Sequence, residues 1–285
     1  MKLSVFTVAT PDLTPEQLAQ EAKAAGLQGI EWRYKEVPEG AKGEAPSFWR
    51  NNLCSISPFA GDEEKLRFKA AAESEGLVSL SVTPYVGVGD VAGTEEVLRT
   101  AKLIGASFIR VGIAGYTSAS TSTYPVLFEQ TRGFLQEAAE LCRQYGVKGL
   151  VETHHNTIAA SASAARRLLD GFDPDVLGVL YDPGNMVHEG YEQYRAGIEM
   201  LGPYLAHVHV KNAKWLPGER AAEGTIAWTS SWAPIREGVV NWKTVIDALK
   251  SVGYDGYLGV EDFSGQYDSR TMLKEFARYM HELNG

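Results

Sequence analysis

Cysteine is scarce in this sequence, with only two residues, Cys54 and Cys142, among 285. They lie in unrelated segments without Cys-x-x-Cys spacing, and no secretory signal precedes them. This pattern argues against a disulfide framework and against a zinc site built from thiolates. We interpret both cysteines as small apolar residues of the core.

Positive charge is also in short supply, because 27 lysines and arginines face 36 aspartates and glutamates. A net charge of -9 does not suit a nucleic-acid groove, which needs clustered basic residues to displace phosphate counterions. No apolar run reaches the ~20 residues that a membrane helix needs. The N-terminal MKLSVFTVATPDLT also lacks a basic region before its short apolar stretch. The sequence therefore predicts a cytoplasmic protein with no nucleic-acid or membrane partner.

Apolar residues are abundant, at 44% of the chain, and they recur in strand-like runs that alternate with helical patterns. We count eight such runs, each followed by a helix, without a domain linker between them. This alternation is typical of a parallel sheet with right-handed crossovers, and eight repeats close into a barrel. An open doubly wound sheet is the alternative, but no GxGxxG turn follows the first strand. We predict a single α/β domain, a (β/α)8 TIM barrel over residues 1–285.

Two segments show no sustained periodicity. We predict a structured surface loop at residues 34–61, which is rich in proline and glycine. We predict a second long loop at residues 211–240, which contains Trp215, Trp228 and Trp232. Both are expected to lie near the active-site end of the barrel.

Four of the predicted strands end in a residue that can bind a metal ion: Glu152, Asp182, His209 and Glu261. The carboxyl ends of the strands carry the active site in this architecture, so we expect the four side chains to meet. Each residue alone could cap a strand or pair with a surface cation, but four at one rim favour a metal site. Three carboxylates and one imidazole suit Mn²⁺, Mg²⁺, Co²⁺ or Fe²⁺ and would also hold Zn²⁺. We favour Mn²⁺, or Mg²⁺, because the site is hard and anionic.

Histidines near these strand ends are further candidates. His154 lies two residues beyond Glu152, so its side chain points the same way if the strand continues, and His155 then points outward. We predict that His154 binds substrate or carries a proton. His207 shares the inward phase of His209 one layer deeper, and we interpret it as a hydrogen-bonded core histidine.

Other polar residues could contact a substrate. Glu31 and Arg33 end the second strand and Arg110 lies inside the fourth, where structural ion pairing is an equally good explanation. Asn185 can hydrogen-bond a sugar hydroxyl but cannot carry a proton. Lys211 follows His209 in the same phase and is either a substrate contact or a solvated loop lysine. We take Glu31, Asn185 and Lys211 as substrate-binding candidates.

Aromatic residues are numerous near the predicted rim. They are Trp32, Tyr85, Trp215, Trp228, Trp232 and Phe263. Aromatic faces pack well against the apolar face of a sugar ring or a flat aglycone, which favours a carbohydrate or polyol ligand. We include Trp215 among the substrate-binding candidates.

Five motifs occur along the chain in the order GLVETHH, VLYDPGN, AHVHVKN, REGVVNW and LGVED. Together they resemble the xylose isomerase-like TIM-barrel superfamily of sugar phosphate isomerases and epimerases, over essentially the whole chain. The resemblance implies metal ligation by Glu152, Asp182, His209 and Glu261. It also implies that Glu152 and Glu261 are catalytic, removing a proton from one face of the substrate and returning one on the other through an enediolate. Relatives often form dimers or tetramers, so a homo-oligomer is also implied.

The chain departs from the epimerase pattern at Asn185, where those enzymes tend to carry histidine three residues after the metal-binding aspartate. We therefore hold several functions open. The first is a metal-dependent sugar isomerase or epimerase. The second is a lyase or dehydratase acting on a keto-sugar, a keto-inositol or a 3-keto-glycoside. An endonuclease IV-like phosphodiesterase is disfavoured by the acidic charge and only six histidines, and a non-catalytic sugar-binding barrel is the remaining alternative.

Overall fold

The computed structural model describes residues 1–190 and 192–284. Within them, eight parallel strands form the wall of a barrel. They are β1 (Lys2–Phe6), β2 (Gly29–Tyr34), β4 (Val78–Pro84), β5 (Phe108–Arg110), β6 (Lys148–Glu152), β7 (Leu177–Tyr181), β8 (Leu205–Val210) and β11 (Tyr257–Val260). The order is β1–β11–β8–β7–β6–β5–β4–β2, and β1 also pairs with β2, which closes the barrel. The predicted (β/α)8 TIM barrel is confirmed.

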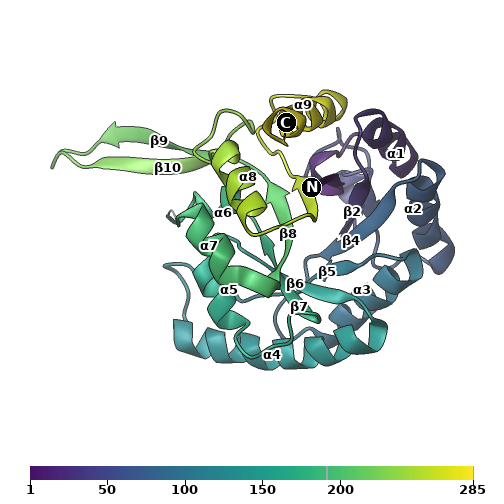
Figure 1. The fold of residues 1–285 in the computed structure, drawn as a ribbon, viewed down its shortest axis with the longest axis horizontal. Coiled ribbons are helices and arrows are strands. Elements are labelled where there is room, and N and C mark those ends of the chain that lie inside the picture. Colours follow the sequence, from purple (N-terminus) through teal and green to yellow (C-terminus); the bar gives the residue numbers. More distant parts are fainter. Residues whose placement is uncertain (191, 285) are drawn as a thin grey trace.

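Helices surround the strands and cover the outer face of the barrel (Figure 1). They are α1 (Pro15–Ala24), α2 (Asp62–Ser74), α3 (Val91–Ile104), α4 (Tyr124–Tyr145), α5 (Ala162–Leu168), α7 (Tyr194–Leu201), α8 (Trp242–Ser251) and α9 (Ser269–Asn284). The short α6 (Pro183–Met186) begins directly after β7. None of these described helices combines the length and apolarity required to cross a membrane.

Local sequence explains where these elements begin and end. Thr14 caps α1 in a capping box with Gln17, whose side chain accepts from the Thr14 backbone, and Pro15 occupies the first turn. The long α4 ends at Gly146, whose φ of 67° is a left-handed conformation that favours glycine. Every residue of β7 is buried, as expected for a parallel strand covered on both faces. This rigid strand leads directly into Asp182.

The segment from residue 211 to 240 differs from our prediction, because most of it is a β-hairpin and not a loop. Strands β9 (Ala213–Arg220) and β10 (Ile226–Trp232) pair in antiparallel fashion and project away from the barrel (Figure 1). Trp228 is 55% exposed, whereas Trp232 at the base of the hairpin is half-buried. The hairpin therefore delivers Trp232, and not all three tryptophans, to the barrel mouth.

The segment from residue 34 to 61 also contains regular structure. The two-residue strand β3 (Ser55–Ile56) pairs in parallel with β2, outside the closed barrel. Three short 3₁₀ turns complete the element list: η1 (Thr7–Ala9), η2 (Glu39–Ala41) and η3 (Gly202–Tyr204). The predicted surface loop is thus anchored to the barrel wall at β3.

Candidate metal centre

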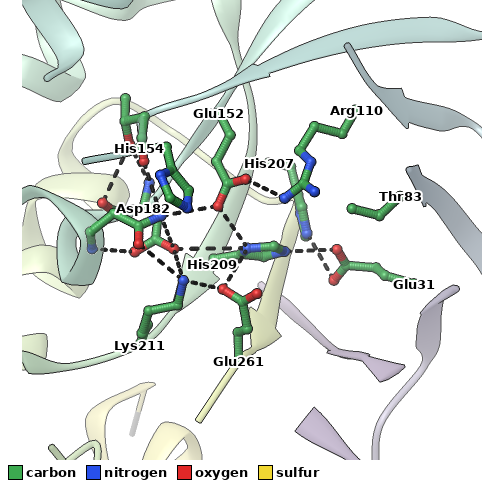
Figure 2. A network of polar contacts seen from close by, with 12 residues as sticks. Glu31, Thr83, Arg110, Glu152, His154, Asp182, His207, His209, Lys211 and Glu261 are labelled. Carbon is green, nitrogen blue, oxygen red and sulfur yellow. Dashed lines mark hydrogen bonds and ion pairs between the residues drawn. The ribbon is translucent and has the colours of Figure 1, made fainter. Parts of the chain in front are cut away.

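Four side chains meet at the carboxyl ends of β6, β7, β8 and β11 (Figure 2). Glu152, Asp182, His209 and Glu261 each offer one ligand atom, and these atoms lie within 4.8 Å of one another. All four residues are buried. We call them the outer cluster. The sequence predicted that these four side chains would meet, and the structure shows that they do.

His209 shows how well this outer cluster suits a cation. Its Nε2 lies 2.9 Å from Glu31 Oε2, and an ionised carboxylate only accepts, so Nε2 carries the hydrogen. Nδ1 then points toward Glu261 Oε2, Glu152 Oε1 and Asp182 Oδ2 at 3.5, 3.8 and 3.9 Å. This nitrogen is buried without a hydrogen-bond partner. Three carboxylates around one imidazole nitrogen favour positive charge at this point, whether a proton on Nδ1 or a metal ion that replaces it, so the donor set fits a divalent metal ion.

Asn185 and Arg110 hold the carboxylates in place. Asp182 caps α6 by accepting from the Asn185 backbone at 2.9 Å. The Asn185 amide donates to Glu152 Oε1 and to Asp182 Oδ2, both at 3.0 Å. Arg110 Nη1 donates to Glu152 Oε2 at 2.6 Å. Asn185 is fully buried, so in this structure it orients two of the candidate ligands.

Lys211 places an ammonium group beside the outer cluster. Its Nζ lies 2.9 Å from Asp182 Oδ2 and also contacts Glu261 Oε2. It donates to Asn185 Oδ1 at 3.2 Å. These two carboxylate oxygens are the same atoms that face His209 Nδ1. Lys211 therefore neutralises part of the negative charge that a metal ion would meet.

Burial and neighbouring charges shift the pKa values of the outer-cluster carboxyl groups in different directions. Burial raises the pKa of Asp182. Burial acts in the same direction on Glu152, but Arg110 and other positive neighbours outweigh it and hold the pKa of that carboxyl well below its usual range. The pKa of Glu261 is lowered as well, because Lys211 outweighs burial. Glu152 and Glu261 are therefore carboxylates at neutral pH, as metal ligation and base catalysis both require.

A second group of metal-capable residues lies deeper in the barrel. We call Glu31, His207 and His209 the inner cluster. His207 Nε2 lies 2.9 Å from Glu31 Oε1, and Ser4 Oγ donates to the same oxygen at 2.8 Å. Gly259 leaves room for this group, because a Cβ there would collide with Glu31 Oε1. Glu31 is 1% exposed and acts on the site through His209.

A cavity of about 540 Å³ opens above the outer cluster. Glu152 and Glu261 reach its wall, whereas the wall does not include Asp182 or His209. Lys211, Arg110 and His154 add polar groups, and the aromatic part consists of Trp49, Tyr85, Trp232 and Phe263. This volume lies within the range of small-molecule sites.

The structure places the predicted substrate-binding residues in two groups. His154 and Lys211 lie on the cavity wall. Within residues 1–190 and 192–284, the side chains that line the cavity do not include Glu31, Asn185 or Trp215. Trp215 is 39% exposed on β9 and donates through Nε1 to the Val187 carbonyl at 2.9 Å. In this conformation the three side chains therefore support the site without lining it.

One histidine lies at the cavity against expectation. His155 was expected to point outward, but it lies on the wall, because β6 ends at Glu152 and strand alternation ceases there. Its ring stacks between those of His154 and His188, with 4.3 Å between ring centroids on each side. His188 also packs against Trp232 at 4.4 Å. The turn residues Thr153–Asn156 give no periodic signal that would have revealed this stack.

Comparison with known proteins identifies the family. A model of the xylose isomerase-like TIM barrel matches residues 19–283. The chain belongs to this family. Curated relatives include inosose dehydratases from Lactiplantibacillus plantarum, 26% identical over 90% of this chain and 93% of that enzyme, and from Geobacillus kaustophilus, 24% identical. The second match spans about half of each protein, at 52% of both.

Solved structures share the fold over nearly the whole chain. The probable 3-DHS dehydratase AsbF from Bacillus anthracis has a TM-score of 0.72 and 19% identity, with 99% of both chains covered. D-psicose 3-epimerase from Clostridium cellulolyticum H10 has a TM-score of 0.70 and 17% identity, covering 99% of this chain and 97% of that one. The IOLI protein with a bound zinc atom has a TM-score of 0.71 and 16% identity, covering 100% and 96%. The same fold therefore occurs in a dehydratase and in an epimerase.

Proposed function

We propose that the protein is a divalent-metal-dependent enzyme that removes a proton from the carbon next to the carbonyl of a keto-sugar or keto-polyol. The convergence of His209 Nδ1 and three carboxylates beside the cavity carries this proposal. A divalent ion held by the outer cluster would act as a Lewis acid on the substrate carbonyl and a neighbouring hydroxyl. We favour Mn²⁺ or Mg²⁺ because three of the four ligands are carboxylates.

Glu152 and Glu261 are the proposed bases. Both reach the cavity wall, and their approach from different strands allows each to meet a different face of a bound substrate. General-base catalysis by a positioned carboxylate contributes about 10² to 10⁴-fold. Arg110 and Lys211 hold positive charge beside the cavity, where it would stabilise the developing enolate.

Elimination of water is the outcome that we favour. Inosose dehydratases are the curated relatives described above, and the enzyme from L. plantarum is matched over 90% of this chain. In elimination, one carboxylate takes the proton while the hydroxyl on the next carbon leaves and needs a proton. The imidazolium form of His154 could supply it from Nε2, because Nδ1 is already engaged with the His155 carbonyl at 2.7 Å.

Epimerisation or isomerisation is the second candidate. Two carboxylates that both reach the cavity can take a proton on one face and return it on the other. The fold neighbour D-psicose 3-epimerase makes this chemistry the natural competitor. Asn185, which cannot carry a proton, weighs against a strict ketose 3-epimerase.

Deuterium exchange tests the shared step. The Mn²⁺-loaded protein is incubated in D₂O with a panel of inososes, ketoses and 3-keto-glycosides, and mass spectrometry follows the products. We expect solvent deuterium on the carbon next to the carbonyl. In dehydration the product mass falls by one water molecule, whereas in epimerisation the mass changes only by the deuterium taken up. Glu152→Gln and Glu261→Gln should each lower the rate by about 10² to 10⁴-fold.

The control for these two variants is Glu129→Gln, which removes an exposed carboxylate from α4. It should leave exchange at the wild-type rate. Absence of exchange with every member of the panel, in protein whose manganese content has been verified, would contradict the proposed enolisation.

A further inference from the structure

The ring of Tyr85 lines the cavity and is surrounded by three positive side chains. Lys35 Nζ, Arg110 Cζ and Arg33 Cζ lie 4.8, 5.0 and 5.8 Å from the ring centroid. We call these four residues the Tyr85 cluster. Positive charges gathered around one ring repel one another, so nearby anions would stabilise the cluster.

Arg33 is the member whose charge is least compensated. Its side chain is fully buried, and its hydrogen bonds go to neutral acceptors: Nη1 to Ser55 Oγ at 2.5 Å and Nη2 to the Trp49 carbonyl at 3.2 Å. Its Nε has no hydrogen-bond partner in the described part of the chain. Buried charges are normally paired with an opposite charge, because desolvation is otherwise expensive. The guanidinium lies next to Trp49 and Tyr85, which both line the cavity.

Nearby carboxylates do not fill this need. Across residues 1–190 and 192–284, no ion pair joins Arg33 or Lys35 to an acid, and Glu36 bonds instead to Ser57. Burial, and then the charge of Arg33, lower the pKa of Lys35, which agrees with an excess of positive charge. Glu152 does bind Arg110, but it is also a candidate metal ligand.

Arg33, Lys35, Arg110 and Lys211 contribute four positive charges around the cavity and behind its wall. Glu31 and the three carboxylates of the outer cluster contribute four negative ones. A divalent ion in the outer cluster would therefore leave a positive excess of two charges. A neutral sugar would leave this excess unmatched.

We propose that the Tyr85 cluster binds an oxyanion carried by the substrate, a carboxylate or a phosphate, so that the ligand is a polyhydroxy acid and not a neutral polyol. The inference rests on the proposed function for the position of the reacting carbons, which lie at the outer cluster. The acidic group then lies against Tyr85 and Arg110, with Arg33 directly behind the wall. Guanidinium groups match the geometry of both oxyanions, and such charge-assisted hydrogen bonds are stronger than neutral ones.

Calorimetric titration of the Mn²⁺-loaded protein with three probes on one carbon skeleton tests this inference: D-glucitol, D-gluconate and D-glucitol 6-phosphate. We expect at least one acid to bind about tenfold more tightly than the neutral polyol, with a preference that weakens as salt is added. The acid that binds more tightly identifies the oxyanion as carboxylate or phosphate.

Variants locate the acid-binding group. Arg33→Gln should lower the affinity for the preferred acid about tenfold and Lys35→Met about threefold, with neutral-polyol binding unchanged in both. Lys35 is only half-buried, so Lys35→Met decides the question if Arg33→Gln does not fold. Lys274→Met on α9 removes an exposed positive charge as the matched control and should change neither affinity.

Two results would overturn the proposal. Equal affinity for the acids and the neutral polyol would show that the charge excess does not select the ligand. An acid preference that survives in every folded variant would show that the metal ion holds the acid. The deuterium-exchange experiment is independent, because exchange with neutral ketoses would sustain the proposed function even if the Tyr85 cluster binds no oxyanion.

Discussion

The inner and outer clusters share His209, yet they have opposite characters. The inner cluster joins one carboxylate, Glu31, to two imidazoles, and Glu31 and His207 are each 1% exposed with no access to the cavity. The outer cluster joins three carboxylates to one imidazole, and two of its carboxylates reach the cavity wall. We therefore expect that metal-capable residues at close range are not sufficient for a metal site. An excess of negative charge and a route from solvent distinguish the outer cluster.

The inner cluster orients His209. Glu31 accepts from His209 Nε2, which fixes the tautomer and directs Nδ1 toward the three carboxylates. Such a hydrogen bond to the distal nitrogen of a metal-binding histidine orients the ring and raises its basicity. The two clusters therefore act together. The inner cluster orients His209, and the outer cluster places negative charge next to the cavity.

Removing a carboxylate from the outer cluster should have the largest effect. Asp182→Asn deletes a charge and disturbs the cap of α6, so we expect Mn²⁺ affinity to fall by more than about 100-fold, beyond the range of effects on supporting residues. Titration of free Mn²⁺ by electron paramagnetic resonance measures this directly. Asp255→Asn, an exposed position, serves as the control. Wild-type affinity in Asp182→Asn would remove the outer cluster from consideration.

A smaller loss is expected from the inner cluster. Glu31→Gln keeps the shape of the side chain but removes the charge that accepts from His209, so Mn²⁺ affinity should fall about 10 to 100-fold. The same titration applies, with the thermal midpoint recorded to separate metal binding from unfolding. If this loss matched or exceeded that of Asp182→Asn, the inner cluster and not the outer one would be the metal site.

Lys211 offers a test with the opposite sign. Its ammonium already neutralises the Asp182 and Glu261 oxygens that face His209, so it competes with a metal ion for them. Lys211→Met should therefore raise the affinity for Mn²⁺. Because the substitution removes one positive charge that competes for the same oxygens, we expect an increase of about tenfold. Isothermal titration, with Lys274→Met as the control, measures the change. Weaker binding would mean that the ammonium organises the carboxylates more than it competes.

The convergence of the outer cluster was predictable because it follows from topology. Asp182 ends a continuous apolar run, and the carboxyl ends of all parallel strands in a barrel share one rim. The four ligand candidates needed only the strand ends to be located correctly. The inner cluster was harder to predict, because it depends on Gly259, whose missing side chain gives space to Glu31 across the barrel. A glycine in a buried strand is visible in the sequence, but its neighbour across the barrel is not.

The hairpin at residues 213–232 was mistaken for a loop because of its composition. Pro217 and Gly218 interrupt β9, and both residues ordinarily weaken a strand. A two-stranded ribbon has only edge strands, however, so Pro217 can stand opposite Trp228 without breaking a sheet. His155 escaped prediction for a similar reason, since strand alternation was extended beyond the last residue of β6.

The smallest effect is expected at the histidine stack beside the outer cluster. Burial lowers the pKa of His155 to about 3 and that of His188 to about 4, from an ordinary 6.5. Below pH 6.5 the unfolded chain takes up protons at these positions while the folded protein does not, so unfolding becomes easier as the pH falls toward 4. Burial opposes charge on His209 as well, but Glu31 and its other acidic partners outweigh it, so the pKa of His209 is raised and acid does not weaken the inner cluster through this group.

Thermal unfolding of the metal-free protein between pH 7 and pH 4 separates these contributions. His155→Gln and His188→Gln should each flatten the decline of the melting temperature with acid, since the replaced side chain no longer titrates. His281→Gln, which changes an exposed histidine on α9, should leave the decline unchanged. If all three variants kept the wild-type slope, acid sensitivity would have to arise from residues other than His155 and His188.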